Sequence, residues 1–272
     1  MNRIKQIVTC LTISALSFGV ACKPSQKIAS APSDVQLLPN SPAWGALWMQ
    51  RAAEYRALCF QAYNFAKISL DNAIMTHSGK PLAIVTDIDE TVLDNSPYTV
   101  HQVRKQSKYT PGSWAEWTAK ANADTVPGAP SFFQYAASKG VTIFYITNRN
   151  ESERAVTIKN LQKWNFPFSD DAHLLLMGKS SDKETRRNTV AANYDIVLYC
   201  GDNLGDFSSV FDNKKSDSRL QWTESNKALF GVQYIELPNT MYGNWEDAYY
   251  DGKPHATFQQ ANHILDSLMK DY

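Results

Sequence analysis

The sequence predicts an α/β fold: a doubly wound parallel sheet with a smaller, mainly helical cap lobe. Five apolar runs have the length and composition of strands buried on both faces, and helical patterns separate several of them. This alternation is typical of a parallel sheet covered by helices. A long insertion at about residues 95–126 follows the first run and is too long for a simple connection, so we expect it to contribute to the cap lobe.

Length and charge narrow the classes of function. The chain has 272 residues, enough for one large domain or a domain with a modest second lobe. Lys and Arg together number 27, as do Asp and Glu, and no run of Lys or Arg forms a basic stripe. Binding to a nucleic-acid polymer therefore has little electrostatic support, and we expect no such partner.

Residues 1–21 have the pattern of an export signal. Basic residues precede a mostly apolar stretch that is too short to span a bilayer comfortably. Small residues then stand directly before Cys22, as at a bacterial lipoprotein processing site, which predicts lipidation of Cys22. Because Gly19 replaces the usual bulky aliphatic residue, plain secretion with a free Cys22 is the alternative. The lipoprotein prediction implies a membrane anchor in the bacterial cell envelope, at the outer membrane or in the periplasm.

A tether and a helical segment are expected next. Residues 22–40 are rich in Ser, Pro, Ala and Gln and lack periodicity, which is typical of a flexible linker. Residues 41–80 form the N-terminal helical segment of the cap lobe, beginning at Ser41-Pro42. Apolar residues recur there at three- and four-residue steps to about Met75, which predicts one long helix or two with a bend.

The core is expected to span residues 81–240, and residues 241–272 form a C-terminal segment. Strands are predicted at 82–86, 141–146, 173–177, 196–200 and 232–237, and helices at 130–139, 151–164 and 182–192. Cys59 lies in a helical pattern and Cys200 ends an apolar run, so we expect two buried thiols rather than a disulfide.

The run LAIVTDIDETVLDNSPY, residues 82–98, indicates a reactive site. Asp87 and Asp89 follow the first strand one residue apart, and Thr91 continues the spacing. Residues two apart on an extended segment project to the same side, where two carboxylates repel unless a cation or a shared proton intervenes. The pattern suits a divalent metal, a nucleophile and a proton shuttle in one site. The alternative is a structural turn or helix cap.

Polar residues follow the other predicted strands too. Residues 147–149, Thr-Asn-Arg, come after the second strand, and the loop after the third contains Lys179 and Lys183. The fourth strand is followed by Asp202 and Asp206. Ligands of doubly wound folds bind beyond the carboxyl ends of the strands, so we expect these side chains to converge on one rim.

These motifs, in this order, resemble those of the haloacid dehalogenase superfamily. More closely they resemble the class C acid phosphatases, the bacterial lipoprotein acid phosphatase and 5'-nucleotidase branch of that superfamily. The strings that carry the resemblance, from about Trp48 to Trp245, are WMQRAAEYRAL, TDIDETVLDNSPY, VPGA, FYITNR, YDIVLYCGDNLGDF and LPNTMYGNWE. The resemblance implies a Rossmannoid core and a metal-dependent acid phosphatase acting on small phosphomonoesters, including nucleoside 5'-monophosphates. It also implies Mg²⁺ as cofactor and suggests a homodimer.

The resemblance further implies roles for the acidic residues. Asp87 would attack phosphorus and form an aspartyl-phosphate, while Asp89 would protonate the leaving alcohol and later accept a proton from water. Asp87 and Asp202 would give carboxylate oxygens to Mg²⁺, and Asp89 its main-chain carbonyl. Asp206 and Thr91 would not bind the metal directly but would orient the groups around it, in the case of Asp206 a water or a lysine.

Phosphate-binding residues are implied in the same way. Thr147 and Asn148 would donate hydrogen bonds to phosphoryl oxygens, and Lys183 would neutralise their charge. Lys179 lies nearby, but Lys183 fits better because it begins a helical pattern. The alternative for Lys183 is a solvated surface lysine.

Aromatic residues are candidates for leaving-group contacts. Tyr242 and Trp245 follow the fifth strand and could stack on a base. Trp114 and Trp117, in the insertion, are either further substrate contacts or part of the cap core. Two other functions stay open: a phosphotransferase that uses the same intermediate, and a non-catalytic lipoprotein binding module.

Overall fold

The computed structural model describes residues 41–212, 215–250 and 258–270, which all belong to one compact unit of the chain. The predicted signal at 1–21, Cys22 and the tether at 22–40 lie outside the described residues. Within these described ranges, no helix is both long enough and apolar enough to cross a membrane.

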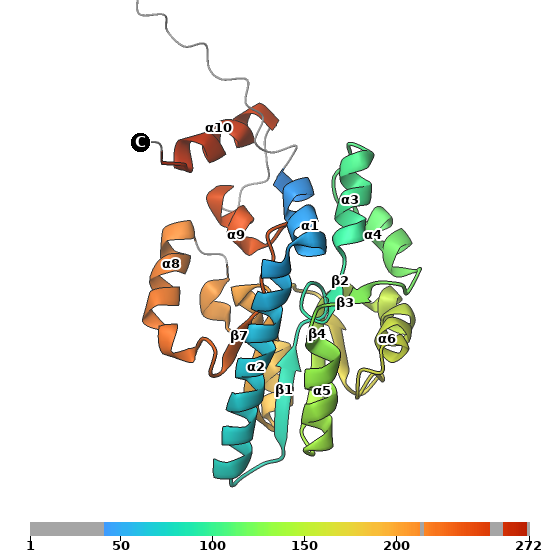
Figure 1. Ribbon diagram of the computed structural model, residues 1–272, viewed down its shortest axis with the longest axis vertical. Coiled ribbons are helices and arrows are strands. Elements are labelled where there is room, and N and C mark those ends of the chain that lie inside the picture. The colour runs from blue at the N-terminus through green and yellow to red at the C-terminus, as the bar shows by residue number, and fades with distance from the viewer. Residues whose placement is uncertain (1–40, 213–214, 251–257, 271–272) are drawn as a thin grey trace, which may run out of the picture. The chain divides into compact units, whose positions relative to one another are not determined.

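A five-stranded parallel sheet with the order β5-β4-β1-β6-β7 forms the centre of the fold (Figure 1). Its strands are β1 (Leu82–Thr86), β4 (Thr142–Asn150), β5 (Leu174–Met177), β6 (Asp195–Gly201) and β7 (Tyr234–Glu236). The predicted α/β fold class is confirmed, and each strand falls where an apolar run predicts it. Because β1 lies between β4 and β6, the carboxyl ends of these three strands adjoin.

Side chains of the strands alternate between two apolar layers, as the two-residue period of a strand requires. Ile84 and Ile143 belong to the larger core, together with residues of α2 (Ala53–Thr76) and α5 (Ala129–Ser138). Val85 and Phe144 belong to a smaller cluster that contains Val190 of α7 (Glu184–Ala191). Helices therefore cover both faces, and α2 and α5 share one of them (Figure 1). Each such large apolar side chain stabilises the fold by roughly 1.5–3 kcal/mol on burial.

The N-terminal helical segment consists of two helices. α1 (Ser41–Arg51) and α2 are separated at Ala52, whose backbone is extended at φ −77° and ψ 129°. The hydroxyl of Tyr63 on α2 donates to the main-chain oxygen of Thr91 at 2.7 Å. α2 therefore anchors the loop that follows β1.

The insertion between β1 and β4 has elements that the sequence did not predict. It contains α3 (Ser96–Arg104), α4 (Pro111–Thr118) and β3 (Asp124–Thr125), and β3 pairs antiparallel with β2 (Leu93–Asp94). α1 packs against α3, and Gln50 donates to the hydroxyl of Ser96 at 2.9 Å. The first helix of the chain thus contacts the insertion.

The remaining elements join the strands or follow β7. α6 (Arg154–Lys163), preceded by the 3-10 turn Glu151–Glu153, connects β4 to β5. The sequence did not predict α8 (Ser216–Ser225), α9 (Asn244–Asp247), α10 (Phe258–Leu268) or the further 3-10 turns at 204–206, 209–211, 227–229 and 248–250. Of these, α8 is polar, and α9 and the turns are short. Cys59 and Cys200 are buried free thiols, as predicted.

Candidate active site

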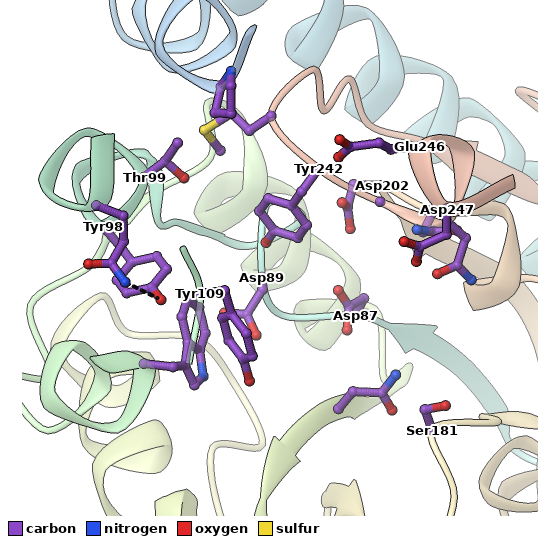
Figure 2. Close-up of a pocket in the computed structure, with 18 of the residues that line it drawn as sticks. Asp87, Asp89, Tyr98, Thr99, Tyr109, Ser181, Asp202, Tyr242, Glu246 and Asp247 are labelled. Carbon is purple, nitrogen blue, oxygen red and sulfur yellow. Dashed lines mark hydrogen bonds between the residues drawn. The ribbon is translucent and has the colours of Figure 1, made fainter. Parts of the chain in front are cut away.

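A cavity of about 1140 Å³ lies beyond the carboxyl ends of the strands (Figure 2). Asp87 and Asp89 line it from the loop after β1, Lys183 from the residue before α7, and Asp202 and Asp206 from the turn after β6. Asn148 and Arg149, at the end of β4, line it as well. The parallel strand order brings these segments together, as the rim motifs predicted.

Three buried aspartates form an acidic group in this cavity. One carboxylate oxygen of each of Asp87, Asp202 and Asp206 lies within 4.8 Å of the other two. Thr91 donates to Asp202 at 3.3 Å, and the side-chain amide of Asn239 donates to the other Asp202 oxygen at 2.8 Å. Burial and the two neighbouring aspartates raise the pKa of Asp202 well above its usual range.

Lys183 is the buried cation of this group. Its ammonium nitrogen lies 2.5 Å from Asp87 Oδ1 and 2.6 Å from Asp206 Oδ1. Burial alone would lower the pKa of Lys183, but the two carboxylates reverse this and raise it. Burial, with the charges of Asp206 and Asp89, raises the pKa of Asp87 to about 7 even though Lys183 opposes the shift. One ammonium therefore does not balance three carboxylates, because it leaves a formal surplus of two negative charges.

This donor set fits a hard divalent cation. Carboxylate oxygens are the ligands that Mg²⁺ and similar ions prefer, and a divalent ion would cancel the surplus charge. Asp206, which the resemblance assigns to a supporting role, belongs to the same group of three. It also contacts Lys183 through Oδ1, and its Oδ2 accepts from the backbone N–H of Asn203 at 3.1 Å.

Asp89 has different partners from Asp87. Its Oδ1 lies 2.6 Å from Nη2 of the buried Arg149 and accepts from the side-chain amide of Asn95 at 2.8 Å. Sequence reasoning placed Arg149 at the rim without a role and did not identify Asn95. The two aspartates of the first motif thus lie in distinct environments, one beside an ammonium and one beside a guanidinium.

Glu90, the residue directly after Asp89, holds the loop that follows β1 in a tight turn. Its φ of 58° is in the left-handed region, and its side chain is fully buried. One carboxylate oxygen accepts from the backbone N–H of Asn95 at 2.7 Å, and the other accepts from the hydroxyl of Tyr242. Burial raises the pKa of Glu90 well above its usual range. The sequence offered no signal for this role beyond the position of Glu90 beside Asp89.

The two predicted phosphate donors after β4 are placed differently. Asn148 lines the cavity, but Thr147 is fully buried, lies outside the described lining, and accepts through Oγ1 from the backbone N–H of Arg149 at 3.1 Å. Arg186 donates to Asn148 Oδ1 at 2.7 Å and to the Thr147 main-chain oxygen at 2.6 Å. A guanidinium has only donors, so the amide NH₂ of Asn148 points away from Arg186 and can donate elsewhere. The sequence did not identify Arg186.

The structure separates the two candidate lysines. Lys183 is only 7% exposed and contacts Asp87, which excludes the alternative of a solvated surface lysine. Lys179 is exposed and is absent from the described cavity lining.

Aromatic side chains form one wall of the cavity. Tyr98 packs edge-on against Trp114, with ring centroids 5.1 Å apart, and Tyr109 contacts both rings. Tyr98 and Tyr109 lie on the Asp89 side of the cavity in Figure 2, and Tyr242 projects toward its centre. We call Tyr98, Tyr109 and Trp114 the aromatic wall.

The other two aromatic candidates lie elsewhere. Trp117 donates to Asn95 Oδ1 at 2.8 Å and packs against the core. Trp245 donates to the main-chain oxygen of Tyr242 at 3.1 Å and is not among the described residues that line the cavity.

A parallel sheet with an aspartate pair after its central strand, a buried lysine and a second acidic loop defines a haloacid dehalogenase (HAD) type of protein. The family profile described as HAD superfamily, subfamily IIIB (acid phosphatase) matches residues 9–245. The chain belongs to this family, and the family predicted from the rim motifs is confirmed.

Solved structures and curated proteins agree with this assignment. The class C acid phosphatase from Bacillus anthracis with tungstate bound is 41% identical, covers 86% of this chain and 99% of its own, and superposes with a TM-score of 0.83. A second structure of the Bacillus anthracis enzyme gives 40% identity and the same TM-score of 0.83. Acid phosphatase 1 from Solanum lycopersicum is 26% identical over 167 residues, or 58% of this chain. That match spans 57% of the tomato protein. The stem 31 kDa glycoprotein of Glycine max is 27% identical over 161 residues, and this match likewise spans 57% of that protein.

Proposed function

We propose that the protein is a metal-dependent acid phosphatase that hydrolyses small phosphomonoesters through an aspartyl-phosphate on Asp87. The contact between Asp87 and Lys183 carries this proposal, because it places a buried carboxylate beside a cation within the cavity. A nucleophile that attacks a phosphate ester must approach a negatively charged group, so a nearby ammonium lowers the cost of the encounter.

Two steps account for hydrolysis. In the first, a carboxylate oxygen of Asp87 bonds to phosphorus, the bond from phosphorus to the leaving oxygen breaks, and that oxygen takes a proton from the carboxyl group of Asp89. In the second, Asp89 removes a proton from water, whose oxygen bonds to phosphorus as the bond to Asp87 breaks. Lys183 and the amide of Asn148 stabilise the phosphoryl oxygens in both steps.

The acidic group is the proposed metal site. Asp87 and Asp202 would hold Mg²⁺, with the main-chain carbonyl of Asp89 as a further ligand and Thr91 supporting Asp202. The mutual proximity of Asp87, Asp202 and Asp206 supports a place for Asp206 at this site as well. When bound, the ion would neutralise carboxylate and phosphoryl charge.

The cavity supports a substrate with a flat leaving group. A volume of about 1140 Å³ exceeds what a phosphate group needs, and the aromatic wall offers ring surfaces for stacking. Nucleoside 5'-monophosphates combine a phosphate with such a group. Tungstate, which is bound in the relative from Bacillus anthracis, is a tetrahedral oxyanion like phosphate, and this supports an oxyanion site here.

A panel of phosphomonoesters, assayed for released phosphate with Mg²⁺ and with chelator, tests the proposal. Asp87→Asn is nearly isosteric and should lower kcat by more than about a thousandfold while the protein stays folded. Full activity of this variant would refute the assignment of the nucleophile.

The same assay separates the rival functions. With added acceptor alcohols, a phosphotransferase would produce phosphorylated alcohol in place of free phosphate. A binding module would bind the esters without releasing phosphate under any condition. The presence of Asp87, Asp89, Lys183 and Asp202 at one cavity favours hydrolysis over simple binding.

Export and lipidation of Cys22 complete the proposal, on the pattern of residues 1–21. Incorporation of radiolabelled fatty acid into the full chain, and its loss in Cys22→Ala, would test the anchor. The homodimer stays a prediction, for which light scattering of the purified protein is the test.

A further inference from the structure

Arg149 forms a forked contact with Asp89, the proposed proton donor. Arg149 Nη2 donates to Asp89 Oδ1 at 2.6 Å, and Arg149 Nε lies 3.2 Å from each carboxylate oxygen. The Arg149 side chain is 2% exposed and that of Asp89 is 17% exposed, so water competes little for this contact. A forked guanidinium contact fixes both the position and the plane of a carboxyl group.

Arg149 is itself held in place from a separate element. Its Nη1 donates to the hydroxyl of Thr157 on α6 at 3.1 Å, and its backbone N–H donates to Thr147 Oγ1 at 3.1 Å. Both threonines are fully buried. The guanidinium therefore has a fixed position relative to β4 and α6. Because Asp89 is paired with this guanidinium, the position of its carboxyl group is fixed as well.

The guanidinium also touches the aromatic wall. Its central carbon lies 5.7 Å from the centroid of the Trp114 ring. Asn95 donates to the same carboxylate oxygen, Asp89 Oδ1, at 2.8 Å, and its own side-chain oxygen accepts from Trp117 at 2.8 Å. Both groups that hold Asp89 are thus in contact with tryptophans of α4, the second helix of the insertion.

We infer that Arg149 is a positioning residue that aims the carboxyl group of Asp89 at the leaving oxygen and links its position to the aromatic wall. This inference rests on the proposed function, in which Asp89 gives a proton to the leaving group. As the leaving oxygen takes that proton, the electron pair of the O–H bond stays on Asp89. The resulting carboxylate remains paired with Arg149.

A series of leaving groups tests this role. An alkyl alcohol needs the proton from Asp89 to depart, whereas 4-nitrophenolate departs readily without it. Arg149→Lys keeps the charge but removes the fork. We expect kcat/KM for an alkyl phosphate such as glycerol phosphate to fall about 10- to 100-fold, within the range of general acid catalysis. For 4-nitrophenyl phosphate the loss should stay below about threefold, because that reaction depends little on general acid catalysis.

Control variants separate positioning from damage to the fold. Arg219→Lys replaces an arginine that is also buried, at 7% exposed, and that donates to the Phe211 main-chain oxygen. Any loss of kcat/KM in this variant should be the same for all the phosphate esters. Thr157→Val removes only the hydrogen bond that holds Arg149 from α6. It should lower kcat/KM for the alkyl phosphate by roughly two- to fivefold, with a smaller loss for 4-nitrophenyl phosphate. If Arg149→Lys does not fold, Thr157→Val carries the test.

A double-mutant cycle provides the second readout. With Asp89→Asn as background, Arg149→Lys should cause little further loss on the alkyl ester, because the group that Arg149 positions has lost its function. Equal losses on all esters, or losses that multiply in the double variant, would overturn the inference. Absence of phosphate release from every ester by the wild-type protein would instead overturn the proposed function.

Discussion

Burial of Asp87 should make the metal-free protein less stable as the pH rises. Its pKa is about 7 in the folded protein, compared with an ordinary value of 3.8, because burial and neighbouring carboxylates disfavour the charged form. Between these two values the folded protein holds a proton that the unfolded chain has lost. Raising the pH through this window therefore favours unfolding.

The magnitude follows from the two pKa values. With 1.36 kcal/mol for each pH unit between them, the free energy of unfolding should fall by up to about 4 kcal/mol over the whole window. Between pH 5 and pH 8 the expected fall is roughly 2–3 kcal/mol, since part of the window lies below pH 5. The stabilising proton is present below the folded pKa of Asp87 and is lost as the pH passes through it.

Urea unfolding of the chelated protein at several pH values measures this effect. Asp87→Asn is the matched control, because asparagine cannot bind or release the proton. The difference in unfolding free energy between wild type and Asp87→Asn should change by roughly 2–3 kcal/mol from pH 5 to pH 8. In saturating Mg²⁺ the wild-type dependence should weaken or reverse, since metal binding requires the deprotonated carboxylate.

A constant difference between the two proteins across this range would refute the reasoning. It would mean that Asp87 has the same pKa in the folded and unfolded states, so that burial and the neighbouring Asp206 do not raise its pKa in the folded protein. A wild-type protein that gains stability relative to Asp87→Asn with rising pH would contradict the sign as well.

Three further predictions concern single residues. A Cβ at Gly201 would lie 2.4 Å from the Cβ of Asp206, so Gly201→Ala should displace the Asp206 carboxylate. Calorimetry should then show Mg²⁺ binding weakened by about 10- to 100-fold. As a control, Gly178→Ala should leave Mg²⁺ binding unchanged, because a Cβ there meets nothing within 4 Å. Tyr242→Phe removes the hydroxyl that donates to a buried carboxylate and should lower the free energy of unfolding by about 1–3 kcal/mol in urea titrations, and an unchanged midpoint would count against that hydrogen bond. Trp114→Ala should raise KM for esters with aromatic leaving groups about three- to tenfold while inhibition by inorganic phosphate stays constant; a parallel change in phosphate inhibition would place Trp114 at the phosphate instead.

The sequence predicts the sheet and the rim well because both depend on local patterns. Continuous apolar runs identify buried parallel strands, and the parallel arrangement brings their carboxyl ends together without knowledge of tertiary contacts. Asp87 stands directly after such a run, and Asp89 and Asp202 each follow one within three residues, so their shared location follows from the fold class.

The remaining site features depend on contacts that local patterns do not encode. Asn95 is five residues beyond Glu90 in sequence, but its interaction with that side chain requires the left-handed turn at Glu90. Arg186 reaches Asn148 across a separation of 38 residues. Arg149 has the same kind of position in the sequence as Asn148, yet its side chain is almost completely buried against Asp89. Such pairings emerge only when the strands and helices are packed.

A crystal structure of the protein with Mg²⁺ and beryllium fluoride, a mimic of an aspartyl-phosphate, tests the central claim most directly. The account predicts beryllium bonded to one carboxylate oxygen of Asp87, and Mg²⁺ coordinated by the other oxygen together with Asp202. Lys183 should remain within hydrogen-bond distance of the mimic or of Asp87. Beryllium fluoride on a different side chain, or a cation that Asp87 and Asp202 do not share, would contradict the account.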